Sequence, residues 1–318
     1  MKNKHERHNL SEHTLIDKLP LICSNELVAV EFLDALRWGD NPTCVHCGSK
    51  VVYKMADAET GKRNKRFLWR CRECKKQYTV RIGMVYEESR LPLRYWWYAF
   101  WRASTSKKGV AALEIKRQLQ ISYQSALFLM NRIRFGMAPS NPEKLKKIVE
   151  CDETYVGGKP RPGSGEHKRG RGTSKTPVFA AVERHGRIRR QARADVCGKT
   201  LKGAIREMVD KKARIMTDDF PAYRGIGKEF KGGHDMVCHS TKEYVRDDIH
   251  TNTAESSFAI LKRGIMGIYH SVSKEYLHRY LWQFDFMWNG RKMNDGERTI
   301  AAIRLAEGKR LMYKQPTA

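Results

Sequence analysis

Four of the eight cysteines form two Cys-x-x-Cys pairs, Cys44 with Cys47 and Cys71 with Cys74. Each pair fits a tight turn, and the residues between the pairs are typical of short strands that bring the turns together. Four thiolates arranged in this way can hold one structural Zn²⁺ in a tetrahedral shell. The alternatives are disulfides or two redox pairs. Disulfides are disfavoured because the N-terminal stretch lacks the apolar segment of a secretory signal.

Three acidic residues lie within or at the ends of separate predicted elements. Asp152 lies in a predicted strand, Asp218 ends a later strand, and Glu255 opens a predicted helix. Carboxylates that converge from separate elements can hold two Mg²⁺ or Mn²⁺ ions, the arrangement that serves in-line phosphoryl transfer. The alternative is that the three acids make structural ion pairs.

Two of these acids have an acidic neighbour, because Glu153 follows Asp152 and Asp219 follows Asp218. Consecutive residues of a strand point to opposite faces of the sheet, so one acid of each pair can join a common site. Alternation alone does not choose between the two members of a pair.

The elements that must position these acids alternate between strand and helix patterns over residues 146–310. We expect three strands, a helix, a fourth strand and further helices. This order predicts an α/β fold, with residues 146–310 forming a ribonuclease-H-like domain. Residues 157–175, rich in Gly, Lys and Arg, are expected to form a basic loop that either binds DNA or is simply solvated.

The part of the chain before this domain divides into three predicted segments. Residues 1–40 are expected to be helical, residues 41–82 to form a zinc ribbon, and residues 90–140 to contain a helix-turn-helix. Ser122 is the expected N-cap of its second helix. In a major groove, the polar side chains of that helix could contact bases or phosphates, and they are Gln124, Asn131, Arg132 and Arg134. The alternative is an ordinary helical hairpin.

The charge of the chain points to a polyanionic partner. Its 318 residues include 61 Lys and Arg against 35 Asp and Glu, a formal net charge of +26. Nucleic acid is the leading partner for a protein with such an excess. No apolar run is long enough for a transmembrane helix, so we expect no membrane partner.

Four segments together resemble the DDE-class insertion-sequence transposases with an N-terminal zinc ribbon, the ISXO-like branch. The resemblance runs from about Leu27 to Arg298, and the segments are CDETYVGGK, TDDFPAY, HTNTAESSFAILKRGIMGIYHSVS and FMWNGRK. It implies that Asp152, Asp218 and Glu255 are the catalytic, metal-binding acids. It also implies that Lys262, about two helical turns after Glu255, contacts a DNA phosphate, although an ordinary surface lysine is the alternative.

The resemblance implies a transposase that binds the terminal inverted repeats of its element. Such an enzyme cleaves DNA and joins the freed 3′-hydroxyl to target DNA, with Mg²⁺ or Mn²⁺ at the acids and Zn²⁺ in the ribbon. Because two ends must be joined, we expect at least a dimer, located in the prokaryotic cytoplasm with the nucleoid. The alternatives are a nuclease of the same fold without strand transfer, and a DNA-binding regulator with an inactive catalytic domain.

Overall fold

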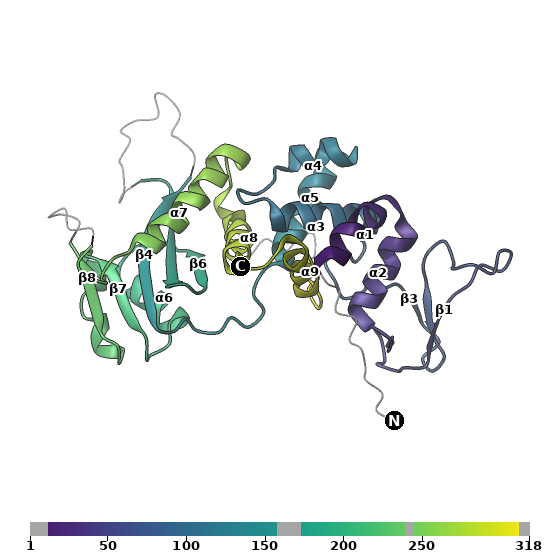
Figure 1. The fold of residues 1–318 in the computed structure, drawn as a ribbon, viewed down its shortest axis with the longest axis horizontal. Coiled ribbons are helices and arrows are strands. Elements are labelled where there is room, and N and C mark those ends of the chain that lie inside the picture. Colours follow the sequence, from purple (N-terminus) through teal and green to yellow (C-terminus); the bar gives the residue numbers. More distant parts are fainter. Residues whose placement is uncertain (1–11, 158–172, 239–244, 312–318) are drawn as a thin grey trace. The chain divides into compact units, whose positions relative to one another are not determined.

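The computed structural model describes residues 12–157, 173–238 and 245–311. They form two compact units, and the colours of Figure 1 follow the sequence through them from purple to yellow. The first unit contains the described residues of Met1–Ser106, Ala112–Met137 and Met293–Gln315, and the second contains those of Lys107–Ala111 and Ala138–Lys292. Most of the predicted basic loop, residues 158–172, lies outside the described residues.

The first unit contains a small antiparallel sheet of strands β1 (Val52–Lys54), β2 (Trp69–Cys71) and β3 (Gln77–Tyr78), in the order β1-β2-β3. The sheet contacts helix α2 (Glu26–Trp38). Buried Asp34 of that helix accepts a hydrogen bond from the Trp69 indole of β2 at 3.1 Å. Arg63 forms an ion pair with the same carboxylate at 2.7 Å. These polar contacts attach the cysteine-bearing sheet to the helical part of the unit.

Helices make up the rest of the first unit. They are α1 (Glu12–Ser24), α2, α3 (Leu93–Thr105), α4 (Ala112–Leu119), α5 (Tyr123–Gly136) and α9 (Asp295–Leu305). Ser122 caps α5 as predicted, since its hydroxyl accepts a hydrogen bond from the Ser125 N–H at 3.1 Å. Helices α4 and α5 pack against each other.

The last helix departs from the predicted boundary of 146–310 for the C-terminal domain. Helix α9 packs on α3, and the Ser104 and Thr299 hydroxyls lie 3.0 Å apart in that interface. Ile300 and Ile303 are buried on the same helix. The chain therefore returns to the first unit after residue 292, a connection between distant segments that local sequence patterns do not reveal.

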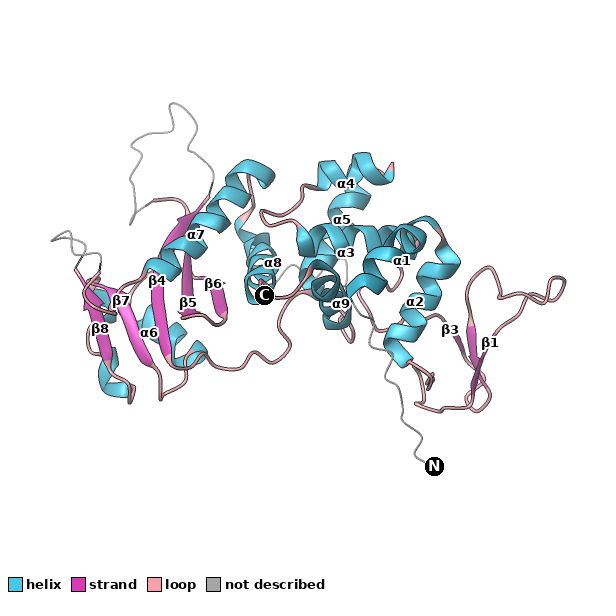
Figure 2. Cartoon of the chain, viewed as in Figure 1, coloured by secondary structure: helices cyan, strands magenta, loops and turns pink. Residues whose placement is uncertain are grey.

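The second unit is built on a mixed five-stranded sheet, drawn in magenta in Figure 2. Its order is β6-β5-β4-β7-β8, with bounds β4 (Ile148–Val156), β5 (Thr176–Glu183), β6 (Ile188–Ala192), β7 (Arg214–Asp218) and β8 (His234–Val237). Strands β4, β5 and β6 are antiparallel neighbours, whereas β7 is parallel to both β4 and β8. The predicted order of three strands, a helix and a strand is observed, and β8 extends it.

Helices cover both faces of this sheet. On one face, α6 (Gly198–Met208) packs its Leu201 and Ile205 against Val149 and Cys151 of β4. On the other face, α7 (Asn252–Gly264) and α8 (Leu277–Asn289) form a second apolar cluster with alternate residues of β5. Because strand residues alternate, Glu150 and Asp152 point to the α7 face. No helix among the described residues is both long and apolar enough to cross a membrane.

Candidate functional site

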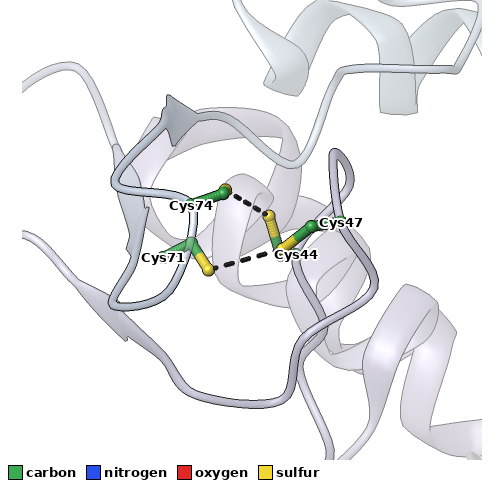
Figure 3. A group of neighbouring side chains, drawn as sticks. All are labelled: Cys44, Cys47, Cys71 and Cys74. Atoms are coloured by element: carbon green, nitrogen blue, oxygen red, sulfur yellow. Dashed lines mark hydrogen bonds between the residues drawn. The ribbon is translucent and has the colours of Figure 1, made fainter.

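The four predicted zinc ligands come together in the first unit (Figure 3). Their sulfur atoms all lie within 4.8 Å of one another, with Cys44 3.6 Å from Cys74 and Cys47 3.7 Å from Cys71. Sulfurs that share a tetrahedral Zn²⁺ at about 2.3 Å are about 3.8 Å apart, whereas a disulfide needs about 2.05 Å. The cluster therefore fits a structural zinc ion and excludes the disulfide alternative.

Strand pairing brings the two turns of the cysteine cluster together. Val52 of β1 is the register partner of Cys71 on β2, which places the second Cys-x-x-Cys turn at the end of the sheet. In the first turn, the His46 N–H donates to the Cys44 sulfur at 3.4 Å. Backbone donors of this kind stabilise a thiolate, which is the form of cysteine that binds zinc.

Two of the predicted catalytic acids lie at the same level on neighbouring parallel strands. The paired register of β4 and β7 ends where Glu150 lies opposite Met216. Two residues further along each strand come Asp152 and Asp218, on the same face of the sheet. The third acid, Glu255, is exposed in the first turn of α7, which packs over that face.

The surroundings of Asp152 show that the three acids are within electrostatic reach of one another. Burial raises the pKa of Asp152, and the negative charges of Glu153, Asp218 and Glu255 raise it further, to about 8. The carboxylate oxygens of the three acids lie further apart than the four cysteine sulfurs. Among the described residues, the cysteines are the group whose ligand atoms all lie within 4.8 Å of one another. Such a concentration of like charge suits cations held between separate elements.

The acidic neighbours of the pair are directed elsewhere. Glu153 accepts a hydrogen bond from the Tyr223 hydroxyl at 2.6 Å, and Tyr223 is buried in the cluster on the α6 face. Asp219 follows the end of β7 and accepts a bond from the Cys238 thiol at 3.4 Å. The geometry of β4 thus separates Asp152 from Glu153, a choice that strand alternation alone left open and that the family resemblance made in favour of Asp152.

Comparison with known families agrees with this arrangement. Residues 144–289 match the ISXO2-like transposase domain, and residues 24–77 match the transposase zinc-ribbon domain, together well over half of the chain. The chain belongs to the ISXO2-like transposases with a zinc ribbon.

A relative of this transposase is an uncharacterized protein in transposable element ISH50 of Halobacterium salinarum. The two are 26% identical over 275 residues, which is 82% of this chain and 90% of that protein. A pre-cleavage Mos1 transpososome structure aligns over 94% of this chain and 97% of its own, with 12% identity and a TM-score of 0.24. A likeness that remote carries no conclusion about the transposase fold.

The transposase's predicted DNA contacts on α5 divide into two groups. Gln124 is exposed and Asn131 is half-buried. Arg132 and Arg134 were expected to reach DNA, but their exposed fractions are 6% and 1%. Arg132 instead donates to backbone carbonyls, at 2.9 Å to Val85 and 2.6 Å to Glu87. The prediction for these two arginines is therefore wrong, because their guanidinium groups are enclosed within the first unit.

Lys262 is exposed on α7, as a DNA contact requires. It lines a cavity of about 520 Å³ in the second unit, together with Lys108, Arg263 and Met266. A further acid on the α7 face of the sheet, Glu150, is fully buried and was not predicted from the sequence. Its position two residues before Asp152 was the available signal, since residues i and i+2 of a strand share a face.

Replacing one zinc ligand tests the cysteine cluster. Cys71→Ser should lose the metal and unfold the ribbon, because a structural zinc ion contributes about 10 kcal/mol or more to folding. Zinc content by mass spectrometry and proteolysis of residues 41–82 are the measurements. Cys197→Ser, a change at an exposed cysteine of the second unit, is the control and should keep one zinc per chain. One retained zinc in Cys71→Ser would contradict the assignment.

The shifted pKa of Asp152 predicts a pH-dependent stability. The Asp152 carboxyl has a pKa of about 8 in the folded state against 3.8 in the unfolded state. Its contribution therefore lowers the free energy of unfolding progressively as pH rises from about 4 to about 8. In metal-free buffer, Asp152→Asn should therefore raise Tm by on the order of 5 °C near pH 8 and by much less near pH 4. Calorimetry across this range measures the difference, and a Tm difference that does not change with pH would contradict the account.

Proposed function

We propose that this transposase cleaves and joins DNA at a site formed by Asp152, Asp218 and Glu255. The observation that carries the proposal is that Asp218 of β7 and Glu255 of α7 lie close enough to Asp152 of β4 for their charges to raise its pKa, in a chain of net charge +26. Burial and the negative charges of its acidic neighbours make Asp152 costly to ionise without a cation. A divalent metal ion bound by these acids would offset that cost.

The topology of the second unit supports a ribonuclease-H-like catalytic domain. Three antiparallel strands are followed by two parallel ones, with α6 on one face and α7 on the other. In this arrangement, a central strand and its parallel neighbour each carry one acid, while a helix across the face supplies the third. The fold thereby holds Asp152 and Asp218 rigidly and presents Glu255 at an exposed position.

Mg²⁺ or Mn²⁺ at this site would activate the attacking hydroxyl and stabilise the leaving oxygen. Asp152 and Asp218 would fix the metal from the sheet, and Glu255 would complete the site from the first turn of α7. Lys262 lies two helical turns after Glu255, where its ammonium group can bind a phosphate of the incoming strand. Water in cleavage and then the 3′-hydroxyl in joining attack the phosphodiester directly, so no covalent enzyme intermediate is required.

We assign DNA recognition to the first unit. The zinc ribbon and the α4–α5 helix-turn-helix would bind the terminal inverted repeats, with exposed Gln124 and half-buried Asn131 as the remaining candidates for base contacts on α5. Two ends must be held together before they are joined, so the active form would contain at least two copies bound to DNA.

A strand-transfer assay with the DNA that flanks this gene tests the proposed function. Asp152→Asn should reduce joining about 10³-fold or more, since metal-assisted charge stabilisation contributes several kcal/mol. Binding of the end DNA should stay within about threefold of the wild type. Glu229→Gln, at a surface acid paired with Arg206, is the control and should join ends normally.

The products of the same assay separate the alternatives. Cleavage of the ends without joining would indicate a nuclease, and DNA binding without either reaction would indicate a regulator. Wild-type joining by Asp152→Asn would show that the active site lies elsewhere.

A further inference from the structure

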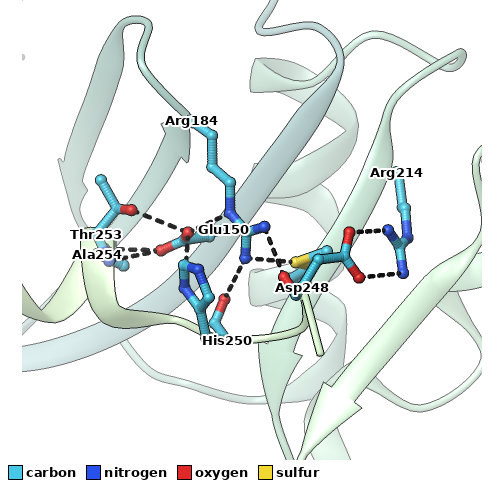
Figure 4. Close-up of polar contacts among 8 residues, drawn as sticks. Glu150, Arg184, Arg214, Asp248, His250, Thr253 and Ala254 are labelled. Atoms are coloured by element: carbon cyan, nitrogen blue, oxygen red, sulfur yellow. Dashed lines mark hydrogen bonds and ion pairs between the residues drawn. The ribbon is translucent and has the colours of Figure 1, made fainter. Parts of the chain in front are cut away.

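Glu150 is a fully buried carboxylate on β4, two residues before Asp152 and on the same face of the sheet. Its carboxylate reaches the beginning of α7 (Figure 4). One oxygen accepts the backbone N–H groups of Thr253 at 2.8 Å and of Ala254 at 3.1 Å. The other oxygen accepts the Thr253 hydroxyl at 2.9 Å.

These contacts make Glu150 the cap of α7, although it lies about 100 residues earlier in the chain. The first N–H groups of a helix have no partner within the helix and require an acceptor. Thr251, which precedes α7, makes no side-chain capping bond, so the carboxylate from β4 takes this role. Its negative charge also suits the positive end of the helix dipole.

Arg184 connects the same carboxylate to the remaining parts of the site. It follows β5, and its Nε donates to Glu150 at 2.7 Å. Its Nη1 donates to the Asp248 carbonyl at 2.6 Å, and its Nη2 donates to the His250 carbonyl at 3.1 Å and lies 2.9 Å from the Met216 sulfur on β7. Arg184 thereby ties β7 and the segment that leads into α7 to Glu150 (Figure 4).

Glu150 and Arg184 therefore contact β4, β7 and the beginning of α7 close to the proposed metal ligands. Glu150 and Met216 lie two residues before Asp152 and Asp218, and Ala254 directly precedes Glu255. Glu150 is not itself placed to be a ligand, because it is fully buried and its acceptor sites are taken by Arg184, Thr253 and Ala254.

We propose that buried Glu150, paired with Arg184, is the positioning unit of the metal site and sets the distance between the two strand carboxylates and Glu255. This inference rests on the proposed function, since it needs the three acids to bind metal. Groups that orient metal ligands without touching the metal typically change metal affinity 10- to 100-fold when they are altered.

Mn²⁺ binding to the full-length protein, followed by electron paramagnetic resonance, tests this role without relying on catalysis. Glu150→Gln keeps the size of the side chain but replaces one acceptor oxygen with an amide that faces N–H donors. It should weaken Mn²⁺ binding about tenfold. Hydrogen exchange at the Thr253 and Ala254 amides should accelerate at the same time, because the cap of α7 is lost.

Ile205→Val is the matched control, a change in the core on the α6 face that touches none of these groups. It should leave Mn²⁺ affinity unchanged even if it lowers stability. Asp152→Asn and Glu255→Gln serve as the reference for loss of a ligand. Should Glu150→Gln fail to fold, Thr253→Val decides alone, because it removes the hydroxyl donor and should weaken binding about threefold.

Two results would overturn the proposal. One leaves the metal site standing, and the other rejects the metal site as well. Wild-type Mn²⁺ affinity in both Glu150→Gln and Thr253→Val, with binding lost in Asp152→Asn, would reject the positioning role and leave the metal site standing. Equal Mn²⁺ binding by the wild type and Asp152→Asn would reject the metal site and, with it, the positioning role.

Discussion

The proposed metal site depends on the different surroundings of two carboxylates, Glu150 and Asp152, which β4 carries on one face of the sheet. Glu150 is compensated by Arg184 and by the first N–H groups of α7, so its charge stabilises the fold. Asp152, two residues on, experiences burial and the charges of neighbouring acids, which raise its pKa to about 8. Strand β4 thus caps helix α7 with Glu150, whereas the charge of Asp152 is left to be balanced by a bound metal ion. We regard this contrast as the physical basis of the proposed metal site.

Apolar packing on the opposite face of β4 holds the strand in place. Val149 and Cys151 are buried against α6, and Glu153 is held by Tyr223 on that side. Apolar packing therefore fixes the strand while its other face carries charge. In the ribbon of the first unit, whose strands are only two or three residues long, the cysteine cluster lies beside a small apolar cluster that includes Trp69 and Tyr78.

Local spacing determined what could be predicted from the sequence. The cysteine cluster and the Ser122 cap follow from motifs of a few residues, and the alternation of strands and helices gave the order of elements in the second unit. The positions of Arg132 and Arg134 could not be predicted in this way, because helical periodicity does not show that distant carbonyls enclose a guanidinium group. The same holds for α9 joining the first unit and for Glu150 capping α7, since both depend on contacts between segments about 100 residues apart or more.

A crystal structure of the protein soaked in Mn²⁺, with anomalous scattering recorded, tests the central claim most directly. The account predicts anomalous peaks about 2.2 Å from carboxylate oxygens of Asp152 and Asp218, with Glu255 completing the site. Glu150 should remain on the first turn of α7, outside ligand distance. Peaks bound by Glu153 or Asp219 instead, or no peak on this face of the sheet, would contradict the claim.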